Sequence, residues 1–116
     1  GIALKYSVAL AERFHAGITV LYSVGKEQVL DVSRLKKDLN TWISDTVSVP
    51  YALEPIIRKG NAAEQIITHA RDERDDLIIL GAQHQSFFQT TFFGKTTDLV
   101  LRHAPVPVLI TPGFMK

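Results

Sequence analysis

Two glycines frame the part of the chain whose residue types could hold an anion. Gly81 follows a short apolar run, and Gly94 stands immediately before Lys95, Thr96 and Thr97. A strand that ends in glycine, a loop, and a glycine at the start of a helix are how α/β proteins build anion pockets. The free N–H groups of the helix start and the ammonium of Lys95 attract negative charge, and the threonine hydroxyls can donate hydrogen bonds. These residues predict a phosphate-binding pocket.

A second interpretation of the same residues is the P-loop. Gly94-Lys95-Thr96 matches the end of its pattern, G-x-x-x-x-G-K-[ST]. The pattern also needs a glycine five residues earlier, where this chain has Gln89, and the aromatic residues before Gly94 are unsuited to a tight phosphate cradle. The P-loop is therefore the weaker interpretation.

Alternating helix and strand patterns must position this pocket. Apolar residues at helical spacing predict helices, and β-branched or apolar runs bounded by glycine or proline predict strands. The expected helices cover 2–15, 27–47, 62–73 and 96–103, and the expected strands cover 18–24, 51–59, 77–80 and 106–111. Pro55, inside the second strand, favours an edge position for it. The order predicts an α/β fold with an open, mainly parallel sheet and helices on both faces.

Several residues mark the faces and ends of the expected helices. Phe14 closes the apolar face of the first helix, and Gly17 ends it. Trp42 belongs to the apolar face of the second helix. Asn61 is the expected N-cap of the third, with Glu64 completing a capping box.

The composition describes a single globular domain. A length of 116 residues with 46% hydrophobic residues supports one core. With 13 basic and 12 acidic residues the formal charge is +1, which does not suggest a nucleic-acid or anionic-membrane partner. Cysteine is absent, which suits a reducing compartment, and no apolar run approaches a membrane span or a signal peptide. We expect a cytoplasmic protein.

Neither a metal site nor a catalytic site is expected. His15, His69, His84 and His103 lack metal-ligand spacing. No Ser/His/Asp arrangement has supporting context, so a catalytic nucleophile or base is not predicted.

Four phenylalanines crowd the loop between the two glycines, at Phe87, Phe88, Phe92 and Phe93. They are unusual for a solvated connection. They would attach the loop to the domain or to a dimer partner, or they would form a lid or an apolar ligand wall.

The C-terminal third of the chain resembles the universal stress protein family. Its nucleotide motif is G-x2-G-x9-G-[ST], followed by a helix and an R-x-A-x-x-P-V-L segment, and here Gly81 and Gly94 match the first and last glycines. Residues 102–109, RHAPVPVL, look like the closing segment. Residues 4–14 are similar to the family's first helix, and residues 60–67 resemble the segment that opens its third helix.

The resemblance implies five parallel strands in the order 3-2-1-4-5. On that template the chain has strands two to five and lacks strand one, which would lie between the strands at 18–24 and 77–80. Strand one also carries the family's Asp near the adenine and ribose. Four strands around a gap would leave buried N–H and C=O groups unpaired. We therefore expect either an N-terminally truncated sequence or a partner chain that fills the gap.

The same resemblance implies a function and a site. A stress-related module would bind ATP or AMP, with Mg²⁺ as a further ligand, and would form a homodimer through the edge strand Val106–Thr111. The implied nucleotide contacts are Val24 and Leu80 beside the adenine, and Gly81, Gly94, Lys95, Thr96 and Thr97 around the ribose and phosphates.

Two residues depart from the family motif. His84 stands at the second glycine, where its ring either offers an N–H to phosphate or remains an exposed loop side chain. Lys95 stands where the family has Ser or Thr; it adds positive charge, and Thr96 or Thr97 could supply the hydroxyl. The departures leave two hypotheses: a nucleotide-binding module, or a dimeric interaction and signalling module that has lost nucleotide binding. An enzyme that slowly hydrolyses ATP is a third.

Overall fold

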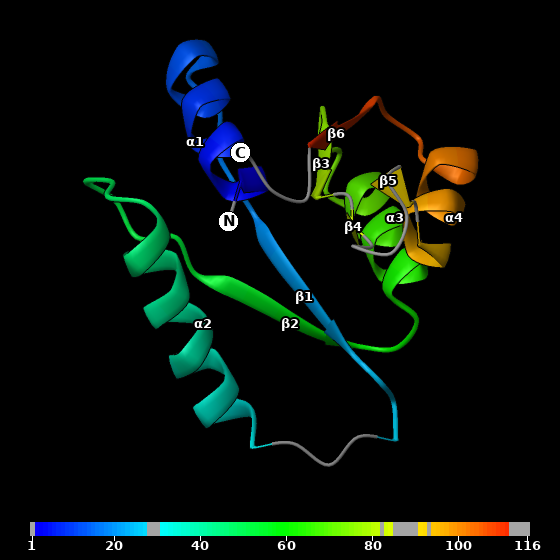
Figure 1. The fold of residues 1–116 in the computed structure, drawn as a ribbon, viewed down its shortest axis with the longest axis horizontal. Helices are drawn as coiled ribbons and strands as arrows, with labels where there is room; N and C mark the ends of the chain where they lie inside the picture. Colours follow the sequence, from blue (N-terminus) through cyan, green and yellow to red (C-terminus); the bar gives the residue numbers. More distant parts are fainter. Residues whose placement is uncertain (1, 28–30, 82, 85–90, 93, 112–116) are drawn as a thin grey trace. The chain divides into compact units, whose positions relative to one another are not determined.

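The computed structural model describes residues 2–27, 31–81, 83–84, 91–92 and 94–111, with 83–84 and 91–92 described by their backbone alone. Its elements are α1 (Ile2–Phe14), β1 (Val20–Val24), α2 (Val32–Thr46), β2 (Pro55–Lys59), α3 (Ala62–Asp72), β3 (Ile78–Gly81), β4 (Gln83–His84), β5 (Thr91–Phe92), α4 (Lys95–His103) and β6 (Val108–Thr111) (Figure 1). Helices alternate with parallel strands, so the predicted α/β class is confirmed. The short antiparallel pair β4–β5 lies where a loop was predicted.

The chain divides into two compact units, Ala3–Asn61 and Ala62–Lys116. The structure has two parallel pairs, β1–β2 and β3–β6, and each lies within one unit. They agree with the pairing of strands two with three and four with five in the order implied by the family resemblance. The complete strand order and the single domain remain predictions.

In the N-terminal unit, β1 pairs with β2 from Val20↔Pro55 to Val24↔Lys59. The predicted strand had Pro55 in its interior. In the structure Pro55 is the first residue of β2, and it is buried. The first position tolerates proline because it can forgo a ladder N–H.

The end of β1 is tied to the residue that follows β2. The Gly60 N–H donates to the Val24 carbonyl at 2.8 Å, and the Ser23 hydroxyl donates to the Gly60 carbonyl at 2.9 Å. Gly60 has a φ of 136°, which L side chains rarely adopt. A glycine is therefore required where the chain leaves β2.

The helix α1 ends in a different way from the prediction. Its last turn is closed by the Ala16 N–H, which donates to the Ala11 carbonyl at 2.9 Å, and the left-handed residue is His15 with a φ of 53°. Gly17, the predicted terminator, lies beyond this turn. Phe14 is 72% exposed, so it does not close the apolar face; Leu4, Val8 and Ala11 form its buried part.

The helix α2 is shorter than predicted and only partly buried. It begins at Val32 after the N-cap Asp31, whose carboxylate accepts from the Arg34 N–H at 3.2 Å. Ile43 is its buried residue, whereas Trp42 is 42% exposed. Apolar spacing identified the helix, but it overstated how much of the apolar stripe the sheet covers.

The core of the C-terminal unit lies under α3 and α4. β3 pairs with β6 from Ile78↔Val108 to Gly81↔Thr111. Ala63, Ala70, Ile78 and Val100 are buried together, and Val100 is completely inaccessible. Ala63 and Ala70 are on α3, and their small side chains allow the backbone of this helix to lie close to the other residues of the cluster. The packing therefore depends on small side chains as well as large ones.

The helix α3 ends in a turn that lacks glycine. Arg74 has a φ of 55°, and the Asp75 N–H donates to the Ala70 carbonyl at 3.0 Å, as in a Schellman motif. The Asp75 carboxylate also contacts His69, with 2.6 Å between Oδ2 and Nδ1, and the two side chains are 31% and 13% exposed. This polar contact takes the place of the hydrophobic one that often accompanies the motif.

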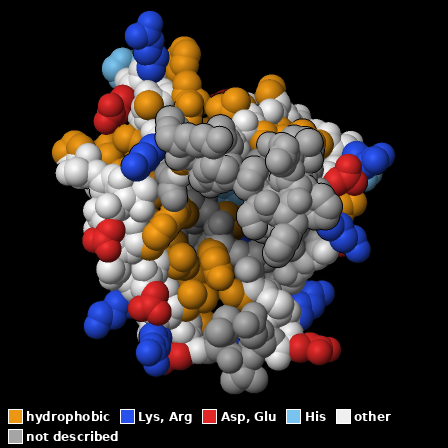
Figure 2. Space-filling view, viewed as in Figure 1, with side chains coloured by type: hydrophobic (Ala, Val, Ile, Leu, Met, Phe, Trp, Pro, Cys, Tyr) orange, Lys and Arg blue, Asp and Glu red, His pale blue; other side chains and the backbone are white. Residues whose placement is uncertain are grey.

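The visible surface is mixed in charge. Figure 2 shows basic and acidic side chains interspersed over the face drawn, in keeping with the formal charge of +1. Within the described residues, no helix is long and apolar enough to span a membrane.

We predict that Gly60→Ala lowers the free energy of unfolding by about 1–3 kcal/mol, because alanine would be strained at this φ. Gly17→Ala is the matched control: no atom lies within 4 Å of an added Cβ there. It should leave stability unchanged or raise it by about 0.4–1 kcal/mol. Urea unfolding measures both variants, and equal stabilities would contradict the role assigned to Gly60.

Candidate functional site

The start of α4 is a helix end without a side-chain cap. Gly94 is the N-cap, with extended φ and ψ of −63° and 171°, and it makes no side-chain cap hydrogen bond. The first helical hydrogen bond runs from the Asp98 N–H to the Gly94 carbonyl at 3.0 Å. The N–H groups of Lys95, Thr96 and Thr97 therefore have no acceptor within the helix. Three donors aimed out of a helix end suit an anion.

Nothing in the described chain requires glycine at position 94. Its φ is one that any residue adopts, and a Cβ built there would meet no atom within 4 Å. Helix N-caps more often use Ser, Thr, Asp or Asn, whose oxygens satisfy the free N–H groups. Glycine instead leaves the helix end open, which fits a phosphate approaching the backbone.

The charges around this helix end favour an anion. Lys95 is exposed in the first turn. Asp98, the acidic residue of that turn, is paired with Arg102 four residues later, with 3.0 Å between Oδ2 and Nε. Both side chains are more than half exposed, so the pair adds little stability, but it offsets part of the negative charge.

The two threonines that follow Lys95 differ in access. Thr97 is 8% exposed and belongs to the buried side of α4, whereas Thr96 is half-buried. Of the two threonines predicted to replace the family's Ser or Thr, Thr96 is the more exposed residue. The backbone N–H of either residue can still serve an anion.

The end of β3 is fixed by a residue that sequence reasoning did not single out. Thr111, the last residue of β6, is 3% exposed and its hydroxyl donates to the Leu80 carbonyl at 3.3 Å. Leu80 packs against the core cluster, and Gly81 is exposed at the strand end. The signal available in the sequence was a polar residue closing an apolar strand.

Other predicted site residues are placed only in part. The backbone of His84 pairs with Thr91 in the β4–β5 hairpin, but its side chain lies outside the described residues, as do those of the four loop phenylalanines. Val24 ends β1 in the N-terminal unit and is 6% exposed. The roles of His84 at phosphate and of Val24 beside adenine stay predictions. Among the described side chains, no three His, Asp or Glu residues gather as a metal site.

A model of the universal stress protein family matches residues 48–112, more than half of the chain. The chain belongs to the universal stress protein family. The matched segment contains β3, α4 and β6, and so it includes the helix end at Gly94.

Comparisons with individual proteins agree with this membership. Universal stress protein Slr1230 of a Synechocystis strain is 36% identical over 59 residues, which are 51% of this chain and 21% of that relative. The chain thus matches about a fifth of that protein's length.

Two solved structures share the fold. Universal stress protein UspA from Lactobacillus plantarum has a TM-score of 0.69 and 24% identity, covering 94% of this chain and 86% of its own. The hypothetical protein MJ0577 has a TM-score of 0.68 and 21% identity, covering 99% of this chain and 88% of its own. At these identities the likeness concerns the fold alone.

We predict that Thr111→Val lowers the free energy of unfolding by about 0.5–1.5 kcal/mol, because valine fills the same buried space without donating to Leu80. Thr41→Val is the control. The Thr41 hydroxyl donates to the Lys37 carbonyl at 3.1 Å on an exposed helix surface, and its loss should change stability by less than about 0.5 kcal/mol. Thermal or urea unfolding compares the two variants; a Thr111→Val effect no larger than that of the control would refute the tie.

Proposed function

We propose that this chain is an adenine-nucleotide-binding module of a stress-related protein and that it acts as a homodimer. The phosphates of ATP or AMP would bind at the start of α4. The observation that supports this best is the helix end at Gly94, where three backbone N–H groups lack acceptors within the helix and the N-cap residue supplies no side-chain cap.

Each residue at that end would have a distinct role. The N–H groups of Lys95, Thr96 and Thr97 would donate to phosphate oxygens, and Gly94 would let the phosphate approach the backbone. The Lys95 ammonium would add a charge-assisted contact, and the accessible Thr96 hydroxyl could donate another hydrogen bond or contact Mg²⁺. Leu80 and Gly81 at the end of β3 would border the nucleoside.

The proposed dimer would use β6. Its backbone pairs with β3 on one side, and no other described strand pairs with it. An apolar edge of this kind is prone to further pairing. Antiparallel pairing with the same strand of a second chain would satisfy the N–H and C=O groups along this edge. Leu109, which is 36% exposed, would lie close to the new interface.

A second candidate function is a dimeric interaction module without nucleotide binding. The observation that favours it is the pair of departures from the family motif, His84 in place of glycine and Lys95 in place of Ser or Thr. Slow ATP hydrolysis is a lesser variant of the first proposal, in which the same residues only position the phosphates.

Isothermal titration calorimetry of the full-length protein with ATP, with and without Mg²⁺, tests the first proposal. We expect saturable binding to the wild type. Absence of heat at millimolar ATP would eliminate nucleotide binding and leave the interaction module.

The decisive variant is Gly94→Asp, which we expect to weaken ATP binding at least about tenfold, because a carboxylate would occupy the helix end and repel phosphate. The same carboxylate can cap α4, so stability should be unchanged or slightly higher. Gly17→Asp, on an exposed glycine with open space around it, is the matched control and should bind ATP normally. Unchanged affinity in Gly94→Asp would rule out the proposed phosphate site.

For the dimer, we predict that Leu109→Lys raises the dissociation constant at least about tenfold, because two like charges would approach each other across the paired edge. Sedimentation equilibrium measures the constant. Leu101→Lys on α4 replaces a side chain that is 46% exposed and should leave the dimer intact. A wild type that remains monomeric throughout, or equal effects of the two variants, would contradict pairing through β6.

A further inference from the structure

The N-terminal unit has a cleft that shares no residue with the start of α4. It opens between the last turns of α2 and the connection 47–54, which leads into β2, and its volume is about 430 Å³. That size is within the range of small-molecule sites. All its lining residues belong to one unit, so the cleft is a property of that unit alone.

The floor of the cleft is apolar. Ile43 is 5% exposed, and Val47, Val49 and Leu53 are half-buried around it. The helix end above this floor is closed by its own backbone, since the Val47 N–H donates to the Ile43 carbonyl at 2.9 Å. The floor therefore offers apolar contact without demanding hydrogen bonds from a ligand.

The rim of the cleft is polar and carries a single charge. Ser44 and Ser48 contribute hydroxyls, Tyr51 contributes a phenol that is 44% exposed, and Glu54 contributes the one carboxylate. Within the described part of the chain, Glu54 makes no ion pair or side-chain hydrogen bond. Tyr51 and Glu54 line the same cleft, and an aromatic ring and a carboxylate are the two groups that attract an organic cation.

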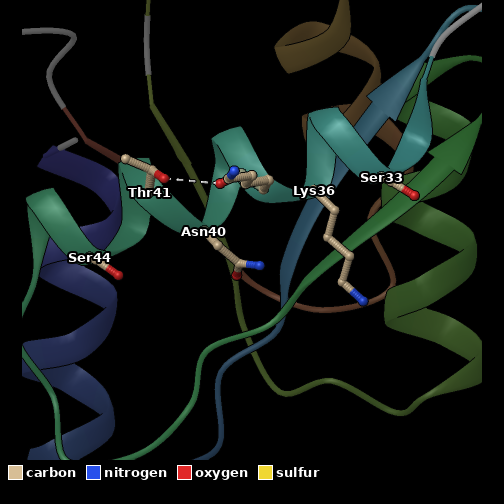
Figure 3. A pocket seen from close by; sticks show the side chains of 6 residues that line it. Ser33, Lys36, Asn40, Thr41 and Ser44 are labelled. Carbon is tan, nitrogen blue, oxygen red and sulfur yellow. Dashed lines mark hydrogen bonds between the residues drawn. The ribbon is translucent and has the colours of Figure 1, made fainter.

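The neighbouring surface of α2 restricts the charge of the ligand. Ser44 and Asn40 continue from the cleft into a polar strip that includes Lys36 and Lys37. Figure 3 shows Lys36, Asn40 and Ser44 on this one helix, where the Thr41 hydroxyl donates a hydrogen bond to the Lys37 carbonyl. The strip is open surface on a single helix. Its two ammonium groups lie outside the lining of the cleft and oppose any excess of positive charge there, so the single Glu54 carboxylate matches a monocation and not a dication.

We propose that the cleft between α2 and residues 47–54 binds a small organic monocation with an apolar body. The body would rest on Ile43 and Val47, and the cationic end would lie between the Glu54 carboxylate and the Tyr51 ring. The residues of this site are distinct from those at the start of α4.

The test is a titration of the uniformly ¹⁵N-labelled full chain with 2-phenylethylammonium, followed by amide chemical shifts. We expect saturable shifts at Ser44, Ser48 and Leu53, with a dissociation constant on the order of 1 mM for a ligand of this size. The neutral analogue 2-phenylethanol and the anion 3-phenylpropionate should bind more weakly. No saturable shift at these amides, or equal binding of the cation and the alcohol, would overturn the proposal.

Two variants locate the contacts. Glu54→Gln should raise the dissociation constant about two- to fivefold, as expected for an exposed ion pair, whereas Asp45→Asn, an exposed carboxylate of α2 outside the cleft, should not change it. Ser44→Phe should abolish binding by filling the cleft. Equal effects of Glu54→Gln and Asp45→Asn, or full binding by Ser44→Phe, would overturn the assignment.

Discussion

The parallel pairing of β3 with β6 is the constraint on which the candidate site depends. Two parallel strands cannot be joined by a tight turn, so the chain must return to the starting edge of the sheet through α4. A helix that makes this return is expected to run opposite to the strands, with its N-terminus on the side of their carboxyl ends. Leu80 and Thr111 meet at those carboxyl ends, where the Thr111 hydroxyl donates to the Leu80 carbonyl.

Much of the fold could be predicted because parallel strands buried on both faces appear as continuous apolar runs. The strands at 78–81 and 108–111 were found in this way, within two residues at each end. Periodicity does not show how much of an apolar face the neighbouring elements cover. The exposure of Phe14 and Trp42 could therefore not be predicted from it. Strand pairs as short as β4 and β5 leave no periodic pattern.

The site was predictable in its framework and less so in its chemistry. Gly94 marked the helix start because glycine interrupts the apolar pattern, and the structure adds that neither its backbone angles nor its packing demands glycine. The hydrogen bond between Thr111 and Leu80 joins residues that are 31 positions apart in the sequence. A local sequence pattern cannot predict a contact between residues so widely separated. The left-handed φ of Arg74 could not be predicted either, because it is set by the turn that ends α3 and not by the residue type.

The open end of α4 also bears on local stability. A helix whose first turn has no cap opens from that end more readily than a capped one, and its first amides exchange with solvent early. A ligand that binds there would act as the missing cap, and the free energy of opening would rise with ligand concentration by mass action. Through Val100, the inaccessible residue of α4, that gain would extend into the core of the unit. With an uncapped glycine at its start, the order of this helix would then depend on whether a ligand is bound.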